Sequence, residues 1–439
     1  MLGLRPFQIV LLAGSLFIFL GSIAFLSVYR PDPDEDILKI TDEVMIWGTL
    51  DRAVIDRQLR KITGNNERFS SIKYREYSEE EFIPEFVDAL AEGQGPDLIV
   101  IPHYQLVELR SKLYALSYDF YTERTFKDTY IEGAEIFALS DGIYALPFAA
   151  DPLIMYWNRD IFSNSNIAVP PRTWETLRND TVPRLTRTGG AFDIIQSAVA
   201  LGEYRNIRNA LPILSMLMLQ SGSNMVIESQ DNYQIALQRG RTSGTGAGLS
   251  PGTASLSFYT EFANPASSLY SWNRSLPEDR QRFLSGDLAL YFGLGSEVES
   301  LQRANPNLNF DVAQVPQGAT ASTLRNYAVF YGLAIPKQAK DVGVSYQVAA
   351  TLVAPESAKT LAEGVDMAVV HRSTQAAGSI DQFQQVRNEA ALIARGWLEP
   401  TRKATEQAFQ TMVEDVTSGR IQVTGAINDA VERLRLAFE

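Results

Sequence analysis

The stretch ALPFAADP, residues 145–152, decides the fold that we expect for this chain. Its two prolines disfavour a helix, because proline lacks a backbone N–H and restricts the residue before it to extended geometry. The stretch is apolar except for Asp151, which stands between Ala150 and Pro152. We therefore predict an extended segment that crosses between two halves of the molecule.

Upstream of this crossing, the apolar residues alternate between the spacing of a strand and that of a helix. The segments are 44–47, 55–62, 72–74, 82–90 and 98–101. Such alternation predicts a parallel sheet with helical crossovers, in which ligands bind beyond the carboxyl ends of the strands. The loops after Trp47 and Ile101 are therefore candidate parts of a binding site.

Downstream of the crossing, a second series of patterns predicts a second lobe. It starts with a strand at 153–157 and continues with helices at 192–201 and 207–220. A segment rich in Gly, Ser and Thr, 239–253, predicts a surface loop that has neither glycine pattern of a phosphate-binding loop. Later patterns predict a helix around 258–262, strands at 288–292 and 328–335, and helices at 344–353, 386–395, 404–416 and 426–437.

An uncharged apolar stretch, Phe7 to Val28, lies near the start of the chain. Its 22 residues would form a helix of roughly 33 Å, enough to cross a hydrocarbon core of about 30 Å. It offers only a poor cleavage site, so we expect a retained anchor rather than a removed signal. Because Arg5 precedes the stretch and acidic residues follow Arg30, the charge bias puts the N-terminus inside. We expect a single-pass cell-membrane protein with an extracytoplasmic ectodomain.

Composition excludes several classes of protein. The chain has 439 residues, enough for an anchor, a linker and about two domain-sized units. Its net charge of -13, without runs of Lys or Arg, argues against a nucleic-acid partner. It has no cysteine, which excludes disulfides and thiolate metal sites. We expect no cofactor and no metal.

Short pieces in a fixed order carry a resemblance to a known family. They are GPDLI (95–99), IYALP (143–147), YWNRDIF (156–162), TWE (173–175), FLSGDLAL (283–290), NPNLNF (305–310), VPQ (315–317) and GLAIPK (332–337). From about Val44 onward, the chain resembles the extracellular solute-binding proteins of family 1, the maltose-binding-protein-like sugar receptors of ABC importers.

The resemblance implies an α/β periplasmic-binding-protein fold of type II, in which two lobes close on a ligand held between them. Each lobe would be a mostly parallel sheet flanked by helices. We expect residues 1–36 to form the transmembrane anchor and acidic linker, 37–148 with 332–378 to form lobe 1, and 149–331 with 379–439 to form lobe 2. The implied partners are a small solute, most naturally a sugar, and the permease subunits of an ABC importer.

A sugar cleft should offer flat aromatic rings and a few fixed polar groups. Trp47 ends the first strand, and Asp51 and Arg52 follow it at the spacing of an acidic and a basic sugar contact in the family. An equally open reading packs Trp47 in the core and makes Asp51 a helix cap. Asp151 stands where the family has a carboxylate facing the cleft. The candidate ligand contacts are Trp47, Asp51, Arg52, His103, Asp151, Trp272, Gly295, Ser296, Tyr327 and Tyr331.

The remaining candidates come from loops and from the second crossing. His103 follows the strand ending at Ile101, where an exposed loop histidine is the stronger reading. Trp272 lies in a polar loop, where an exposed tryptophan would suit a stacking platform. Gly295 would let the backbone approach a ligand, and Ser296 aligns with a tryptophan of maltose-binding protein. Since that ring is missing, Tyr327 and Tyr331 would stack instead.

Catalysis is the rival class of function. Neither histidine, His103 or His371, lies in a hydrolase or metalloprotease motif, so we expect no enzyme. A glycosidase with two carboxylates stays open as an alternative. The same fold as a sensor or adhesion module without a permease is a further one. Our leading hypothesis is a membrane-anchored receptor that delivers a carbohydrate or similar small polar solute to an ABC importer.

Overall fold

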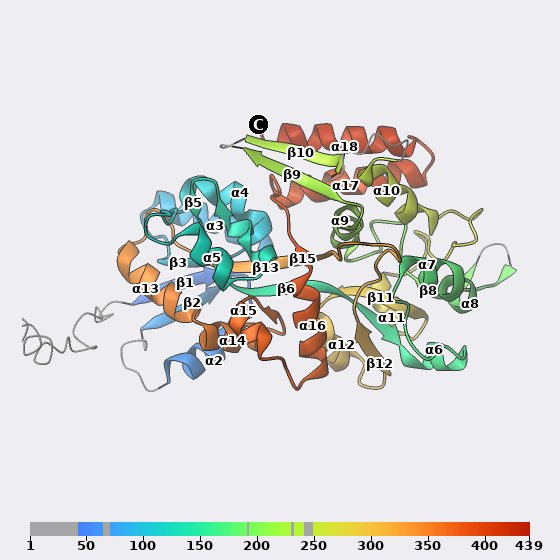
Figure 1. Cartoon of the computed structure of the whole chain (residues 1–439), viewed down its shortest axis with the longest axis horizontal. Coiled ribbons are helices and arrows are strands. Elements are labelled where there is room, and N and C mark those ends of the chain that lie inside the picture. The colour runs from blue at the N-terminus through green and yellow to red at the C-terminus, as the bar shows by residue number, and fades with distance from the viewer. Residues whose placement is uncertain (1–42, 65–70, 191–192, 230–231, 241–248) are drawn as a thin grey trace, which may run out of the picture.

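The computed structural model describes residues 43–64, 71–190, 193–229, 232–240 and 249–439. The expected anchor, Phe7 to Val28, lies outside these ranges. Within them, no helix combines the length and the apolar character needed to cross a bilayer. Figure 1 shows two lobes side by side, with lobe 1 on the left and lobe 2 on the right.

Lobe 1 confirms the alternation of strands and helices predicted for its first half. The elements are β1 (Val44–Gly48), α2 (Arg52–Thr63), β2 (Ile72–Glu76), α3 (Glu79–Ala91) and β3 (Leu98–Pro102). β1 pairs in parallel with both β2 and β3, so the carboxyl ends of all three strands meet at one edge. Ser78 caps helix α3, because its Oγ accepts from the Glu81 N–H and donates to the Glu81 carboxylate.

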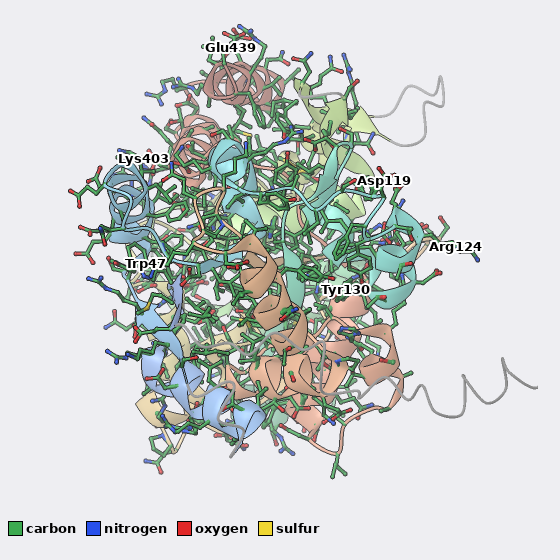
Figure 2. All side chains as sticks on the ribbon, turned by 90° about the vertical axis from the view of Figure 1, so that its left-hand side faces the viewer. Trp47, Asp119, Arg124, Tyr130, Lys403 and Glu439 are labelled. Carbon is green, nitrogen blue, oxygen red and sulfur yellow. The ribbon has the colours of Figure 1, made fainter. Side chains whose placement is uncertain are left out.

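Shorter elements complete lobe 1 around this sheet. They are the turns η2 (His103–Gln105), η3 (Arg110–Lys112) and η4 (Glu132–Phe137), the strands β4 (Ala138–Leu139), β5 (Gly142–Ile143) and β14 (Ala368–Val369), and the helices α4 (Leu106–Leu109), α5 (Glu123–Thr129), α13 (Val342–Leu352), α14 (Pro355–Gly364) and α15 (Arg372–Ala376). Figure 2 looks onto this lobe, with Trp47 toward one side and Tyr130 toward the other.

Lobe 2 is built around strand β11 (Leu288–Leu294), which was predicted. Its other elements are α6 (Arg159–Asn164), α7 (Trp174–Thr176), η5 (Leu177–Thr181), α8 (Val182–Leu185), β7 (Arg187–Thr188), β8 (Ile194–Val199), α9 (Ala210–Gln220), α10 (Pro251–Glu261), α11 (Asp279–Leu284), α12 (Glu297–Ala304), β12 (Phe310–Ala313) and α16 (Gln382–Leu392). The hairpin β9 (Ser223–Ser229) and β10 (Asn232–Gly240) lies beside α17 (Arg402–Thr417) and α18 (Val423–Ala437) at the top of Figure 1.

The helix predicted at 192–201 is wrong, because residues 194–199 form strand β8, which pairs in parallel with β11. Ile194 is buried while Ile195 is 58% exposed, which is the alternation of a strand. The loop predicted at 239–253 is too long at both ends. Gly240 still belongs to β10, and Pro251 already opens α10.

Two antiparallel strands, β6 (Leu146–Asn158) and β13 (Asn326–Ala334), connect the lobes. Residues 146–152 of β6 pair with β13, and residues 149–150 also pair with β14. From Leu153 onward, β6 instead pairs with β11 and then with β12. The predicted crossing at 145–152 and the predicted strand at 153–157 are therefore one continuous strand that exchanges its partners next to Asp151. The lobe boundaries given above stay a prediction.

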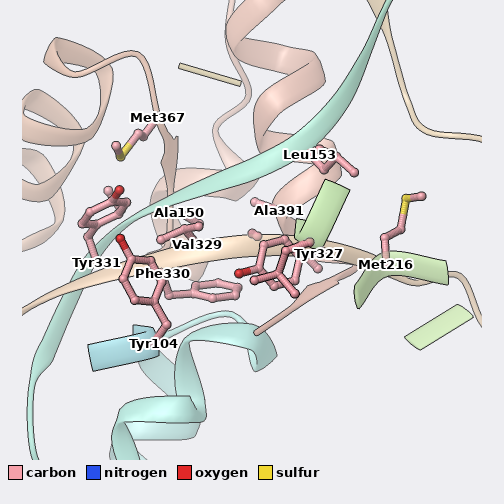
Figure 3. Close-up of a cluster of buried hydrophobic side chains, with 14 of the residues drawn as sticks. Tyr104, Ala150, Leu153, Met216, Tyr327, Val329, Phe330, Tyr331, Met367 and Ala391 are labelled. Atoms are coloured by element: carbon pink, nitrogen blue, oxygen red, sulfur yellow. The ribbon is translucent and has the colours of Figure 1, made fainter. Parts of the chain in front are cut away.

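Both connecting strands are buried, and their side chains form the centre of the core. Figure 3 shows Tyr327, Phe330 and Tyr331 from β13 beside Ala150 and Leu153 from β6, with Tyr104 packed against them. The strands form one continuous sheet with those of both lobes, in the order β2-β1-β3-β13-β6-β11-β8-β7. The short strand β15 (Ala394–Arg395) pairs with the start of β13.

We predict that Gly332→Ala weakens the contact between the connecting strands. An added Cβ would lie 2.9 Å from Ala145 Cβ and 3.3 Å from the Leu146 carbonyl oxygen, so one strand must shift. Such overpacking costs about 1–3 kcal/mol. Calorimetric melting should show a lower Tm than for Gly318→Ala, whose Cβ meets its nearest neighbour at an ordinary 3.8 Å. Equal melting of the two variants would contradict the role assigned to Gly332.

A second prediction concerns Asp279, which is buried and accepts hydrogen bonds from the backbone N–H groups of Arg208 and Arg280. Burial raises its pKa from 3.8 to about 7. Between these values, the folded chain binds more protons than the unfolded chain, so stability falls as the pH rises. Asp279→Asn cannot ionise. Its Tm should therefore fall less than that of the wild type between pH 5 and pH 8, and an identical fall would contradict the shift.

Candidate functional site

A hollow of about 590 Å³ lies between the lobes, within the ~300–1,000 Å³ typical of small-molecule sites. Lobe 1 contributes Thr49, Leu50, Asp51, Ala53, Val54, Arg57 and Glu79. Lobe 2 contributes Arg208, Asn209, Leu294, Ser296, Glu297, Glu299 and Arg303. The connecting strands contribute Asp151 and Tyr331, and the end of α14 with the residues after it contributes Gly364, Val365, Asp366 and Met367. We call this hollow the interlobe cleft.

A larger hollow, of about 870 Å³, lies beside the loop between α15 and α16. It meets the interlobe cleft at Asp366, but no residue of β1–β3 or of the connecting strands lines it. The interlobe cleft lies at the carboxyl ends of the parallel strands β1 and β2, where open α/β sheets bind ligands. We therefore place the candidate site in the smaller hollow.

Asp151, on the connecting strand β6, accepts two hydrogen bonds from Ser296, the residue directly before α12. Its Oδ1 accepts from the Ser296 N–H at 2.9 Å, and its Oδ2 accepts from the Ser296 hydroxyl at 2.6 Å. Burial raises the pKa of Asp151 to about 7, even though both hydrogen bonds favour the ionised form. The carboxyl group therefore changes its protonation near neutral pH, at the point where the two lobes meet.

Glu297 fixes the wall of the cleft that belongs to lobe 2. Its Oε1 accepts from the Leu294 N–H at 2.9 Å and from Asn209 Nδ2 at 3.0 Å. Its Oε2 accepts from the Tyr291 hydroxyl at 2.6 Å and lies 3.5 Å from Arg280 Nε. Because its oxygens are engaged in this network, Glu297 holds the cleft wall in place.

The wall of lobe 1 is the loop after β1. The Tyr74 hydroxyl accepts from the Leu50 N–H and donates to the Leu50 carbonyl, both at 2.9 Å. A Cβ on Gly48 would lie 2.7 Å from that hydroxyl, so only glycine lets Tyr74 reach the loop. Asp51 then caps α2, with Oδ1 accepting from the Val54 N–H at 2.9 Å. The predicted helix cap is confirmed, and the exposed Asp51 also lines the cleft.

Of the ten residues proposed from the sequence, the structure brings Asp51, Asp151, Ser296 and Tyr331 together in the cleft. They come from both lobes and from both connecting strands. Their contact with a ligand stays a prediction. Among the described residues, no group of three or more His, Asp or Glu side chains is placed to hold a metal ion.

The other six candidates do not line the cleft, and three of them are aromatic or apolar core residues. Trp47 is 5% exposed and packs on Tyr77 with 4.7 Å between ring centroids, as the core reading expected. Trp272 is fully buried, and its Nε1–H donates to Asn206 Oδ1 at 3.1 Å. The exposure predicted for Trp272 is therefore wrong, because its polar loop folds back onto lobe 2. Tyr327 is also fully buried, in the core between the lobes.

The other three candidates make contacts elsewhere in the protein; they are His103, Arg52 and Gly295. His103 is fully buried, not an exposed loop residue, and its Nδ1 accepts from the Phe330 N–H at 3.1 Å. Burial lowers its pKa to about 3, so the ring is neutral. Arg52 is exposed and lies 3.3 Å from Asp56. A Cβ on Gly295 would lie 2.9 Å from Arg387, so the glycine makes room for that side chain.

Most of the charged lining was not predicted from the sequence, including Arg57, Glu79, Arg208 and Arg303. A usable signal was present, because Glu79 follows the carboxyl end of β2 and Arg208 follows that of β8. The expectation of flat aromatic surfaces did not extend to these charged residues. Arg57 carries no such signal, since it lies within α2 among other charged residues.

Comparisons with known proteins agree with this architecture. Residues 61–385, most of the chain, match the family described as bacterial extracellular solute-binding protein. A protein of Brucella abortus (strain 2308), named as a binding protein, is 31% identical over 102 residues. That match covers 23% of this chain and 25% of the Brucella protein.

Solved structures share the fold at low sequence identity. A cyclo/maltodextrin-binding protein in complex with maltotetraose superposes with a TM-score of 0.72 at 13% identity, covering 90% of this chain and 97% of its own. An ABC transporter solute-binding protein from Thermotoga lettingae, bound to α-D-tagatose, gives 0.65 at 18% identity, covering 91% of this chain and 100% of its own. These likenesses show the two-lobed α/β fold that was expected. The mostly parallel sheet expected for lobe 2 is wrong, because β11 pairs in parallel with β8 but antiparallel with β6, and β12 is antiparallel to β6 as well. With most of its length matched by the family model, the chain belongs to the bacterial extracellular solute-binding protein family.

Proposed function

We propose that this chain is the solute-binding protein of an ABC importer, anchored in the cell membrane, and that it captures a carbohydrate or similar small polar solute outside the cytoplasm. The lobes would close on the solute by bending at the connecting strands. A closed shape is favoured only by a solute that contacts both lobes, because equal binding to open and closed forms shifts nothing.

One observation carries the proposal: the cleft takes its lining from both lobes, and Asp151 and Tyr331 of the connecting strands line it as well. A solute in this place contacts each moving part at once. Support for a sugar comes from the structural relatives, which are bound to maltotetraose and to α-D-tagatose. Support for a short solute comes from the lining, in which Tyr331 is the one aromatic side chain among the described residues. Long maltodextrins would need more rings to stack on.

Membrane anchoring rests on the apolar stretch Phe7 to Val28, and the importer partnership rests on the family. The acidic linker that follows the stretch would place the lobes outside the membrane surface, where the closed form can meet permease subunits. We propose no catalytic role, since the family is one of binding proteins.

The direct test is to identify what the protein carries. The full chain, purified in mild detergent, should release a small polar solute on denaturation, and mass spectrometry would identify it. The same solute, added back, should bind with an affinity measurable by isothermal titration. A chain that releases nothing and binds no member of a broad sugar panel would contradict the proposal.

We predict that Asp151→Asn weakens solute binding by about tenfold, equivalent to ~1.4 kcal/mol, while the protein stays folded. The amide can still accept from the Ser296 N–H, but it lacks the charge that strengthens a hydrogen bond to a solute hydroxyl. Isothermal titration gives the affinity and calorimetry gives the Tm. Ser296→Ala serves as the control for loss of the 2.6 Å hydroxyl contact. Unchanged affinity in Asp151→Asn, with unchanged Tm, would remove Asp151 from the site.

A further inference from the structure

The carboxyl and guanidinium groups that line the interlobe cleft differ in how many partners they have within the protein. Six carboxyl groups and three guanidinium groups line it, which suggests at first sight a site for a cation. Most of these carboxyl groups, however, already have hydrogen-bond or ion-pair partners within the protein.

Five of the six carboxyl groups already have partners in the protein. Asp51 caps α2, Asp151 accepts from the Ser296 N–H and hydroxyl, and Glu297 is held by its network. Glu299 lies 3.8 Å from Arg303, and Asp366 lies 3.3 Å from Arg387.

Glu79 is the sixth carboxyl group. It is exposed in the first turn of the 13-residue helix α3, where the helix dipole favours a negative charge. Its side chain makes no hydrogen bond or ion pair among the described residues, so its oxygens are open to a solute hydroxyl.

Two of the three guanidinium groups have no hydrogen-bond or ion-pair partner among the described residues. Arg57 on α2 and Arg208 before α9 are exposed, and across the described residues neither side chain makes a hydrogen bond or an ion pair. They stand on opposite lobes, Arg57 in lobe 1 and Arg208 in lobe 2. The backbone of Arg208 is fixed, because its N–H donates to the buried Asp279 at 3.1 Å.

We propose, on the basis of the function proposed above, that the solute carries an acidic group, a carboxylate or a phosphate, which Arg57 and Arg208 bind from opposite lobes. Its hydroxyl groups would meet Glu79. The ligand class is then a sugar acid or a sugar phosphate rather than a neutral sugar.

The same pair gives the solute a way to drive closure. An anion between the lobes would receive a charge-assisted contact from each wall, to which guanidinium groups are well suited. A neutral sugar lacks these contacts, so the pair also discriminates between acidic and neutral solutes.

The test is isothermal titration of the full chain with matched pairs of probes. D-glucuronate and D-galacturonate represent carboxylates, D-glucose 6-phosphate and glycerol 3-phosphate represent phosphates, and glucose, galactose and glycerol are their neutral parents. We expect at least one acidic probe to bind more than about tenfold tighter than its parent, and the binding to weaken as NaCl rises. The comparison of the two acidic groups shows which one the cleft accepts.

Two variants and one control locate the effect. Arg57→Gln and Arg208→Gln should each weaken binding of the acidic probe by about tenfold or more. Both should change the affinity for a neutral parent by less than about threefold. Arg60→Gln, on the same helix α2 and exposed but outside the cleft lining, should leave every affinity unchanged.

The outcomes separate this inference from the proposed function. Tight binding of neutral probes alone, or acidic binding that is the same in Arg57→Gln, Arg208→Gln and wild type, would overturn the role of the arginine pair and leave a solute receptor. Binding of no probe, together with no solute released from the purified chain, would overturn both.

Discussion

The pairing of β6 with β13 is the constraint on which the rest of the structure depends. Both strands run from one lobe into the other, and both are buried. Strand β6 exchanges its partners at Leu153, from β13 and β14 on one side to β11 and β12 on the other. The lobes also meet outside these strands, since Arg110 donates to the Tyr233 hydroxyl and Ser140 donates to Glu228 across the two lobes. Closure about β6 and β13 would bend the sheet and rearrange these outer contacts.

The site follows from this arrangement. Asp151 lies beside the partner exchange and binds the Ser296 N–H and hydroxyl, which ties this part of β6 to the start of α12. Most lining carboxylates around it have hydrogen-bond or ion-pair partners, whereas Arg57 and Arg208, on opposite walls, have none among the described residues. Within that part of the chain, Tyr331 supplies the one aromatic ring of the cleft. In the function proposed above, the fold decides where a solute binds and these charges decide which solute fits.

Much of the fold could be predicted from the sequence, because its signals are local. The spacing of apolar residues gave β1, α2, β2, α3 and β3, and two prolines marked the crossing. The helix expected at 192–201 failed, since a short apolar run suits either a helix or a buried strand until its neighbours are known. The site was harder to predict than the fold. The burial of Trp272 and of His103 depends on tertiary packing, and the hydrogen bonds of Asp151 depend on a partner that is distant in the chain.

The most direct measurement of the central claim is the distance between the lobes with and without solute. The chain has no cysteine, so spin labels at Lys61→Cys on α2 and Asn307→Cys beyond α12, both exposed positions, would report on the lobes without interference. Pulsed electron paramagnetic resonance on the full chain should give a shorter distance between the two labels when the solute identified from the purified protein is added. The same distance distribution with that solute bound would contradict closure about β6 and β13.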